Sequence, residues 1–177
     1  YVEGYLVTDE ARTAATKAAV ELAKASGVKI AVSLSDPFVV AVFGEALREM
    51  IGSRVDLIFC NKDEAMAFTG KESLEAAAES LKQYTNTFAI TDGAKGAITF
   101  DGQNTYQSDG IEAAAIDTNG AGDMFAGAFL YAITSGRSYA WAADLANDCG
   151  ARVVAQFGPR LEAEQFDNIK KKFGINS

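Results

Sequence analysis

The sequence predicts an α/β fold of the doubly wound type, with a mostly parallel sheet that is flanked by helices. Short apolar runs of strand length alternate with longer segments of helical period, which is the pattern of successive βαβ units. Gly27 marks the end of the first helical segment, where a left-handed residue would let the chain turn back into a strand. Because the alternation continues to residue 91, the strands are expected to belong to one sheet.

The expected elements follow in chain order. Strands are expected over residues 1–8, 28–34, 55–59 and 87–91, and helices over residues 10–26, 38–51 and 73–84, with a further helix starting after Asn61. Residues 97–108 predict a hairpin around Asp101-Gly102-Gln103, which would add antiparallel pairing at the edge of the sheet. Helices are then expected over residues 121–135, 138–155 and 162–173.

The composition of the chain limits the classes of protein to which it can belong. A chain of 177 residues with 49% hydrophobic and 23% charged residues is expected to form one globular domain with a sizeable core. Its net charge of −8 argues against a nucleic-acid partner, because a polyanion would be repelled. No apolar run approaches the ~20 residues of a membrane span, and the first residues lack a signal-peptide pattern. We therefore expect a cytoplasmic protein without a membrane partner.

The residue types also narrow the chemistry. The chain contains no histidine, which excludes Ser-His and Cys-His nucleophiles and imidazole metal sites. Cys60 and Cys149 lack CxxC spacing and are expected to be buried free thiols. A general base must then be Asp, Glu, Lys or Tyr. This suits phosphoryl transfer to an alcohol, where positioning and electrostatics do most of the work.

The most informative segment is residues 117–130, which read DTNGAGDMFAGAFL. The small residues Gly120, Ala121 and Gly122 allow backbone N–H groups to point at an anion, and the helix behind them adds the positive end of its dipole. Asp123 follows directly and is placed to accept a hydroxyl proton. A simple N-cap on a glycine-rich approach is the alternative, but the length of the pattern favours a phosphate site.

This segment resembles the C-terminal signature of the PfkB or ribokinase-like kinases, and DTNGAGD is most similar to their adenosine kinase branch. The resemblance implies a ribokinase-like fold with ATP and Mg²⁺ as cofactors, and γ-phosphate transfer to a primary hydroxyl of a nucleoside or sugar. It implies that Gly120, Ala121 and Gly122 form the anion hole and that Asp123 is the catalytic base. Some family members hold a monovalent cation beside the opening Asp-Thr, which makes Asp117 a candidate ligand.

A candidate metal site lies at Asn61 and Glu64, which follow a buried strand and begin a helix. They match the Asn-x-x-Glu motif of the family, and the resemblance implies that they organise Mg²⁺ and the phosphates. Oxygen ligands of this kind suit a hydrated Mg²⁺. The same spacing also fits a capping box, so both interpretations stay open.

Candidate nucleotide contacts come from two segments. The run Thr91-Asp92-Gly93-Ala94-Lys95-Gly96 resembles the Thr-x-Gly-x-x-Gly ATP loop of the family, and its glycines would let backbone amides approach a triphosphate. A glycine turn that opens a hairpin has the same pattern. The resemblance also implies that Asn147 and Gly150 line an adenine pocket, with ordinary helix packing as the alternative. The nucleotide candidates are Thr91, Gly93, Gly96, Asn147 and Gly150.

The acceptor candidates lie in residues 33–38, at the carboxyl end of an expected strand, where open α/β sheets bind ligands. The segment is similar to the Ser-x-Pro-Phe loop of adenosine kinases, which implies that Phe38 stacks on a nucleoside base. Phe38 packing into the core behind Pro37 is the alternative. Asp36 replaces the small residue expected in that branch, and its carboxylate would alter the preferred substrate.

The resemblance covers only the C-terminal portion of the family. The sequence begins at Tyr1, within an expected strand, and shows no counterpart of the lid, the Gly-Gly element or the substrate-binding Asp of the N-terminal portion. We therefore expect residues 1–177 to be the C-terminal portion of a single, truncated ribokinase-like domain. A non-catalytic nucleotide-binding fragment is the alternative, and an uncovered sheet edge would favour a homodimer. A Rossmann-type enzyme is disfavoured because no GxGxxG follows the first strand.

Overall fold

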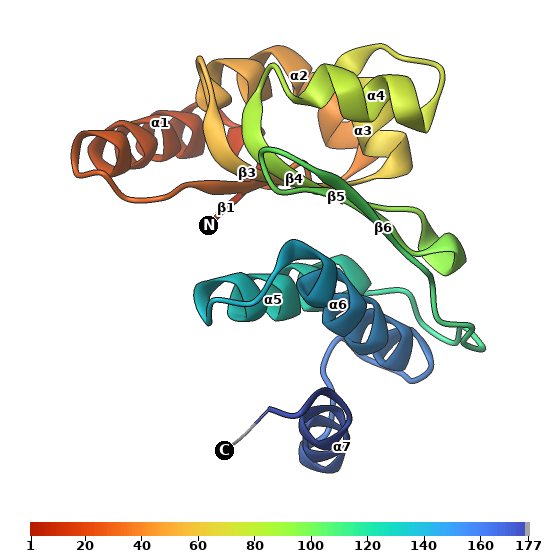
Figure 1. Ribbon diagram of the computed structural model, residues 1–177. Helices are drawn as coiled ribbons and strands as arrows, with labels where there is room; N and C mark the ends of the chain where they lie inside the picture. The colour runs from red at the N-terminus through yellow and green to blue at the C-terminus, as the bar shows by residue number, and fades with distance from the viewer. Residues whose placement is uncertain (176–177) are drawn as a thin grey trace. The chain divides into compact units, whose positions relative to one another are not determined.

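The computed structural model describes residues 1–175 (Figure 1). The chain divides into two compact units, of which the first comprises Tyr1–Ile90 with Phe100–Asn104 and the second comprises Thr91–Thr99 with Thr105–Ser177. Six strands form a sheet in the order β1-β2-β3-β4-β5-β6. Strands β1, β2 and β3 are parallel to one another, with Val32 opposite both Val2 and Ile58. The expected α/β class with a mostly parallel sheet is confirmed.

The strands are β1 Val2–Glu3, β2 Ala31–Ser33, β3 Val55–Asn61, β4 Thr85–Thr91, β5 Ala97–Phe100 and β6 Thr105–Ser108. The helices are α1 Glu10–Ala25, α2 Pro37–Ile51, α3 Lys62–Thr69, α4 Leu74–Leu81, α5 Ala121–Thr134, α6 Tyr139–Val154 and α7 Ala163–Phe173. Short 3₁₀ turns occur at Gly4–Val7 and Gly93–Lys95. Each expected helix is present, with bounds that differ by a few residues.

The prediction of a strand over residues 1–8 is wrong for most of its length. Strand β1 ends at Glu3, because the Gly4 N–H donates to Ser35 Oγ at 2.7 Å and the chain then turns into a 3₁₀ helix. A Cβ at Gly4 would lie 2.7 Å from the carbonyl oxygen of Leu34, so only glycine fits this close approach. Strand β2 is likewise shorter than the expected range of 28–34.

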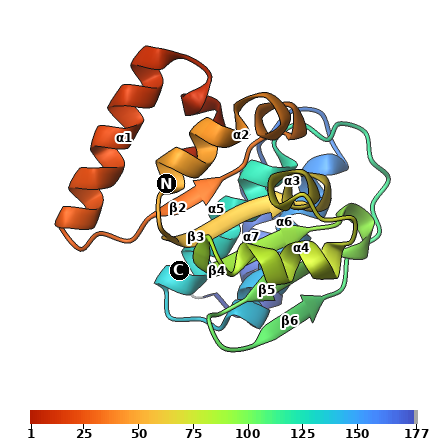
Figure 2. The ribbon, with the colours of Figure 1, turned by 90° about the horizontal axis from the view of Figure 1, so that it is seen from above.

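In the first unit, helices α1–α4 lie on the same side of strands β2–β4 (Figures 1 and 2). Apolar side chains from both layers fill the space between them, as expected for a sheet that must cover its hydrophobic face. The fully buried members include Val32, Leu34, Ile58, Phe68, Leu81 and Phe88. This core fixes the carboxyl ends of β2 and β3. Asp36 follows β2, and Asn61 is the last residue of β3.

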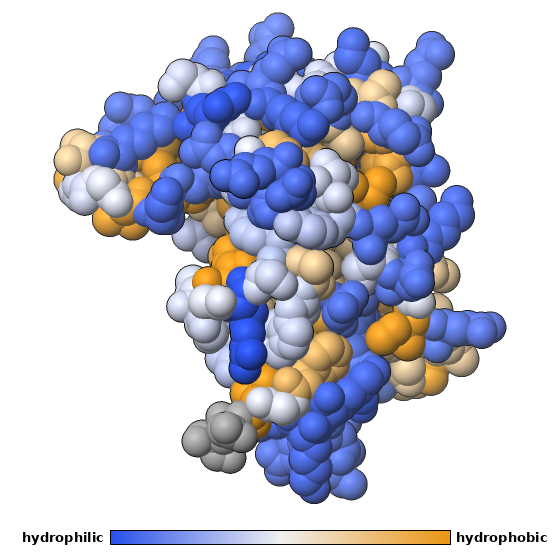
Figure 3. Space-filling view, in the orientation of Figure 1, coloured by the Kyte–Doolittle hydropathy of each residue, from blue (hydrophilic) through white to orange (hydrophobic). Residues whose placement is uncertain are grey.

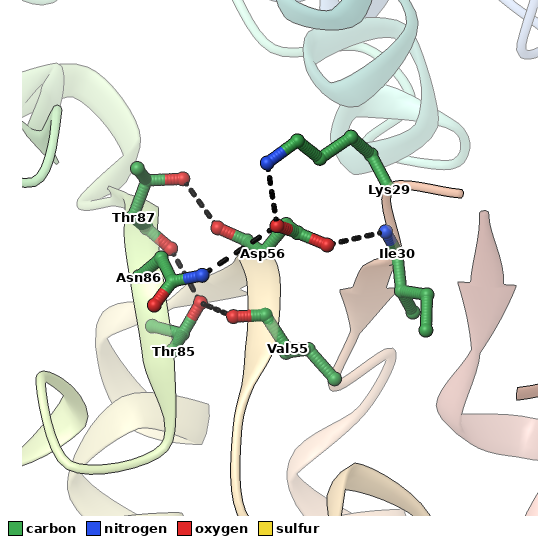
Figure 4. A network of polar contacts seen from close by, with 7 residues as sticks. All are labelled: Lys29, Ile30, Val55, Asp56, Thr85, Asn86 and Thr87. Carbon is green, nitrogen blue, oxygen red and sulfur yellow. Dashed lines mark hydrogen bonds and ion pairs between the residues drawn. The ribbon is translucent and has the colours of Figure 1, made fainter. Parts of the chain in front are cut away.

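A polar network joins β2, β3 and β4 at the opposite end of these strands (Figure 4). Asp56 accepts hydrogen bonds from the Ile30 N–H at 2.9 Å and from Lys29 Nζ at 3.0 Å, and its carbonyl oxygen accepts one from Thr87 Oγ1 at 2.7 Å. Burial raises the pKa of Asp56, but the bonds from Ile30 and Lys29 outweigh it, so the pKa is lowered. The carboxylate therefore stays ionised and ties β3 to the segment that leads into β2, while the Asp56 carbonyl oxygen ties β3 to β4.

In the second unit, α5 and α6 lie side by side (Figure 1). Phe129 of α5 packs edge-to-face on Tyr139 at 5.1 Å between ring centroids, within the range of favourable aromatic pairs. Helix α7 is attached to α6 by the buried Asp148, which accepts hydrogen bonds from Arg152 Nε and Lys172 Nζ, each at 2.6 Å. A buried carboxylate that is paired on two sides fixes the position of α7 on α6.

Two expectations from composition can be compared with the structure. Cys60 and Cys149 are buried and free, as expected. Within residues 1–175, none of the helices has the length and apolar character needed to cross a bilayer.

Candidate active site

The second unit contains a cavity of about 280 Å³, which collects segments that are far apart in the sequence. All the residues predicted to contact nucleotide line it, namely Thr91, Gly93, Gly96, Asn147 and Gly150. Ala121 and Gly122, from the start of α5, line the same cavity. The structure therefore brings together the glycine loop (residues 91–96), the glycine-rich turn (residues 120–122) and one face of α6. The role of each residue stays a prediction.

The glycine loop is held by a close contact between two backbone segments. A Cβ at Gly96, whose φ is +95°, would lie 2.0 Å from the Ser108 carbonyl oxygen, and one at Gly110 would lie 2.0 Å from the Ala94 carbonyl oxygen. Neither position can hold a larger residue without moving the loop. The loop is closed by a hydrogen bond of 2.8 Å from the Asp92 N–H to the Gly96 carbonyl oxygen.

Asn147 has a structural role that the sequence did not reveal. Its amide nitrogen donates to Ser108 Oγ at 2.9 Å and to the Asp109 carbonyl oxygen at 3.2 Å, and Ser108 Oγ donates to Asp144 at 2.6 Å. These bonds attach α6 to the end of β6 and orient Asn147 at the cavity wall. Ser108 and Asp144 are 36 residues apart, so no local pattern could have paired them.

The start of α5 is built by glycine. Gly120 is the N-cap in the left-handed conformation, with φ +78°, and makes no side-chain cap hydrogen bond. A Cβ at Gly120 would lie 2.3 Å from Pro159 Cβ, whereas a Cβ at Gly122 would meet no atom within 4 Å. The first turn thus carries backbone N–H groups without a side-chain cap at the edge of an open space, which is a favourable place for an anion.

Asp117 holds the approach to this turn. Its two carboxylate oxygens accept hydrogen bonds from the N–H groups of Asn119 at 2.9 Å and Gly158 at 3.1 Å. These bonds lower the pKa of Asp117, so it stays ionised. Asp117 therefore ties the turn to the segment after α6. Its predicted role as a cation ligand stays a prediction.

Gly122 and its neighbour Asp123 line different cavities. Asp123 lies in the first turn of α5 and lines a groove of about 620 Å³ between α5, α6 and α7, whereas Gly122 lines the smaller cavity described above. The carboxylate is exposed. The glycine turn and the candidate base thus lie next to each other at a boundary between two spaces.

In the first unit, Asn61 and Glu64 form the capping box at the start of α3. Asn61 Oδ1 accepts from the Glu64 N–H at 2.9 Å, and the Glu64 carboxylate accepts from the Asn61 N–H at 3.0 Å and from Nδ2 at 2.7 Å. Within residues 1–175, no group of three or more Asp, Glu or Cys side chains is placed to hold a metal ion by protein ligands alone. The magnesium role of this pair stays a prediction.

The pKa of Glu64 is raised to about 7, and burial is the largest cause. The hydrogen bond from the Asn61 N–H lowers this pKa, and the negative charges of Asp36, Asp63 and Glu3 add to the increase. Because the folded state holds this proton more tightly than the unfolded state, the free energy of unfolding should decrease as pH rises from 4.5 to 7. The expected loss is on the order of 2 kcal/mol.

Urea unfolding at pH 5 and pH 8 measures this loss, and Glu64→Gln should reduce the difference between the two values. An unchanged pH dependence in Glu64→Gln would show that Glu64 titrates normally.

The acceptor candidates lie at the start of α2. Asp36 is its N-cap and accepts a hydrogen bond from the Phe38 N–H at 2.7 Å, with Pro37 at the first helical position. Phe38 is 66% exposed, so the alternative that it packs into the core is wrong. The ring is accessible for stacking, and the contact with a base stays a prediction.

Comparisons with known proteins identify the family of this chain. The family model described as pfkB family carbohydrate kinase matches residues 1–165. An adenosine kinase from Schizophyllum commune is 29% identical over 92% of this chain and 52% of its own length. A ribokinase from Lactococcus lactis is 32% identical over 67% of this chain and 38% of its own length.

Solved structures of kinases have the same fold as this chain. A probable sugar kinase from Rhizobium etli superposes with a TM-score of 0.89 at 28% identity, over 99% of this chain and 54% of that chain. The adenosine kinase from Sinorhizobium meliloti superposes with a TM-score of 0.84 at 30% identity, over 97% of this chain and 54% of that chain. The chain thus spans about half the length of these relatives, and by its sequence and its fold it belongs to the pfkB family of carbohydrate kinases.

Proposed function

We propose that this chain is the nucleotide-binding and catalytic portion of a kinase that transfers the γ-phosphate of ATP to a primary hydroxyl of a nucleoside or sugar. The observation that carries the proposal is the cavity of the second unit. It joins every residue predicted to contact nucleotide with Ala121 and Gly122 of the signature turn. In this proposal, residues 1–177 are the C-terminal portion of one ribokinase-like domain.

The lining of the cavity suits a nucleotide. Apolar side chains such as Ile111, Phe125 and Val154 offer surfaces for a flat heteroaromatic base, as in most small-molecule pockets. At Gly93 and Gly122 the lack of a side chain leaves backbone N–H groups accessible to phosphate oxygens. The base would lie against α6 and the phosphates against the two glycine turns.

The transfer step uses the first turn of α5. The acceptor oxygen attacks the γ-phosphorus, the bond from that phosphorus to the β–γ bridging oxygen breaks, and ADP leaves with that oxygen. Asp123 accepts the proton of the acceptor hydroxyl. The N–H groups of residues 120–122 stabilise the charge that spreads over the phosphoryl oxygens in the transition state. The Ala121 N–H would exchange its 3.3 Å hydrogen bond to the Thr118 carbonyl oxygen for one to the phosphoryl group.

Magnesium would be bound mainly by the phosphates and water. Mg²⁺ usually keeps several waters and takes only one or two protein carboxylates. When bound, the ion neutralises charge on the phosphates. Asn61 and Glu64 would hold its water shell, and Asp117 would face a monovalent cation.

The acceptor is proposed to be a nucleoside rather than a simple sugar. The exposed ring of Phe38 offers a stacking surface, and two of the relatives described above are adenosine kinases. Asp36 adds a carboxylate that could bind a sugar hydroxyl. A non-catalytic nucleotide-binding fragment is the second candidate, because the chain spans only about half the length of its relatives.

The test measures Mg-ATP binding by titration calorimetry and ADP release with pooled nucleosides or pooled sugars. We expect Gly122→Ala to weaken ATP binding about tenfold, because its methyl group would point into the phosphate space. Gly127→Ala is the matched control, since it lies in the same helix and also meets no atom within 4 Å. Binding without acceptor-dependent ADP release would favour the fragment, and absence of ATP binding would contradict both candidates.

A further inference from the structure

The wall that α6 gives to the cavity of the second unit carries a single polar side chain, that of Asn147. The other described residues of α6 that line the cavity are alanine, glycine and valine. Hydrophilic side chains cover much of the surface seen in Figure 3, so this apolar lining differs from the exterior. The remaining polar side chains among the described lining residues are Thr91 and Thr118, which lie in the glycine loop and in the segment 117–130. A base that lies against α6 therefore meets one side-chain hydrogen-bonding group, the Asn147 amide.

The orientation of this amide is fixed by two acceptors. Asn147 Nδ2 carries two hydrogens, and it donates to Ser108 Oγ at 2.9 Å and to the Asp109 carbonyl oxygen at 3.2 Å. The Asp109 carbonyl can only accept, so a flipped amide would place two oxygens against each other. Ser108 Oγ donates its own hydrogen to Asp144 at 2.6 Å, so it must accept from Asn147. Both N–H groups of the amide are therefore used within the protein.

The carbonyl oxygen Oδ1 of Asn147 stays available to a ligand. The side chain makes no further hydrogen bond within residues 1–175, and Asn147 is partly exposed. An amide oxygen accepts hydrogen bonds and cannot donate them. When an oriented acceptor meets a second acceptor in a largely apolar site, both lose a hydrogen bond that water would have supplied. Such a group therefore distinguishes a ligand that offers a donor from one that offers an acceptor.

We propose that Asn147 selects the nucleotide by the group at position 6 of its purine base. This inference rests on the proposed function of the cavity as a nucleotide site. A 6-amino purine donates an N–H to Asn147 Oδ1. A 6-oxo purine, as in ITP or GTP, places its oxygen against Oδ1, and neither oxygen then has a partner. The polarity of this choice comes from Ser108 and Asp109, because they hold the amide nitrogen away from the base.

The test compares three purine nucleotides by titration calorimetry in the presence of Mg²⁺. ATP has an amino group at position 6, ITP has an oxygen, and purine ribonucleoside triphosphate has only hydrogen, while the ribose and phosphates are the same. We expect ITP to bind the wild-type chain about 10- to 100-fold more weakly than ATP. Purine ribonucleoside triphosphate, which loses the bond but adds no repulsion, should bind roughly three- to tenfold more weakly than ATP. These comparisons do not depend on the folding of any variant.

A variant then assigns the selection to the amide. Asn147→Leu keeps a branched side chain of similar shape and removes both hydrogen-bonding groups. It should weaken ATP binding and leave ITP binding nearly unchanged, so that the two dissociation constants agree within about threefold. A residue that only supported the fold would weaken both nucleotides by the same factor. Asn86→Leu on β4 is the matched control, since Asn86 is exposed and outside the cavity, and it should keep the wild-type ratio.

The outcomes separate this inference from the proposed function. Equal binding of ATP and ITP by the wild-type chain would overturn the selection by Asn147 and leave the nucleotide site in place. Purine ribonucleoside triphosphate binding as tightly as ATP would show that the 6-amino group makes no hydrogen bond, and would also overturn it. A wild-type ratio in Asn147→Leu would assign the selection to another group. Absence of binding by all three nucleotides would contradict the proposed function itself, and this inference with it.

Discussion

Replacing Asp123 by Asn is expected to lower turnover by about 10²-fold or more in a polypeptide that carries this chain and phosphorylates an acceptor. The amide keeps the shape of the side chain but cannot accept the hydroxyl proton. The KM for ATP should change little, because Asp123 lies outside the cavity that joins the predicted nucleotide contacts. Acceptor-dependent ADP release at saturating ATP measures the effect.

A matched control is Glu75→Gln, which removes a carboxylate from the first turn of α4. This change has the same electrostatic effect on a helix N-terminus, with an expected loss of less than about 1 kcal/mol, and should leave turnover unchanged. Near-wild-type turnover in Asp123→Asn would exclude Asp123 as the base. Equal losses in both variants would point to general destabilisation instead.

Gly120→Ala is expected to lower the free energy of unfolding by about 2–5 kcal/mol. A left-handed conformation costs a residue with a Cβ about 1–2 kcal/mol, and forcing an extra methyl group into packed atoms costs about 1–3 kcal/mol. Both effects apply, since φ is +78° and the Cβ would lie 2.3 Å from Pro159 Cβ. Urea unfolding of wild type and variant gives the difference.

Gly127→Ala is the control for this prediction, because it makes the same chemical change in the interior of the same helix. It should stabilise the protein by up to about 1 kcal/mol. If Gly120→Ala were as stable as wild type, then the contact between Pro159 and the turn would not be present in solution. ATP binding measured on the folded fraction would show whether the turn keeps its shape.

Much of the fold follows from local patterns. The alternation of apolar runs predicts the helices and most strands, because side-chain period and capping residues act over a few positions. Strand β1 is shorter than predicted because the Gly4 N–H pairs with Ser35, 31 residues later. A local pattern contains no information about such a partner.

Local sequence patterns also predict only part of the candidate active site. The glycine loop and the signature turn are local, so their residues could be selected from the sequence, and the structure brings them to one cavity. The bonds that hold them are not local: Asp117 pairs with Gly158 across 41 residues, and Asn147 pairs with Ser108 across 39. The segment after α6 also supports the turn through the Gly158 N–H and the close approach of Pro159 to Gly120, and only the structure shows these contacts.

The most direct test of the account is a titration of the protein with a Mg²⁺ complex of a non-hydrolysable ATP analogue, followed by amide NMR. If the cavity binds the nucleotide, the signals of Gly93, Gly96, Gly122 and Gly150 should shift together with one dissociation constant, and Gly122→Ala should weaken that binding about tenfold. Shifts confined to residues outside this cavity, or no shifts at millimolar analogue, would contradict the assignment of the cavity as the nucleotide site.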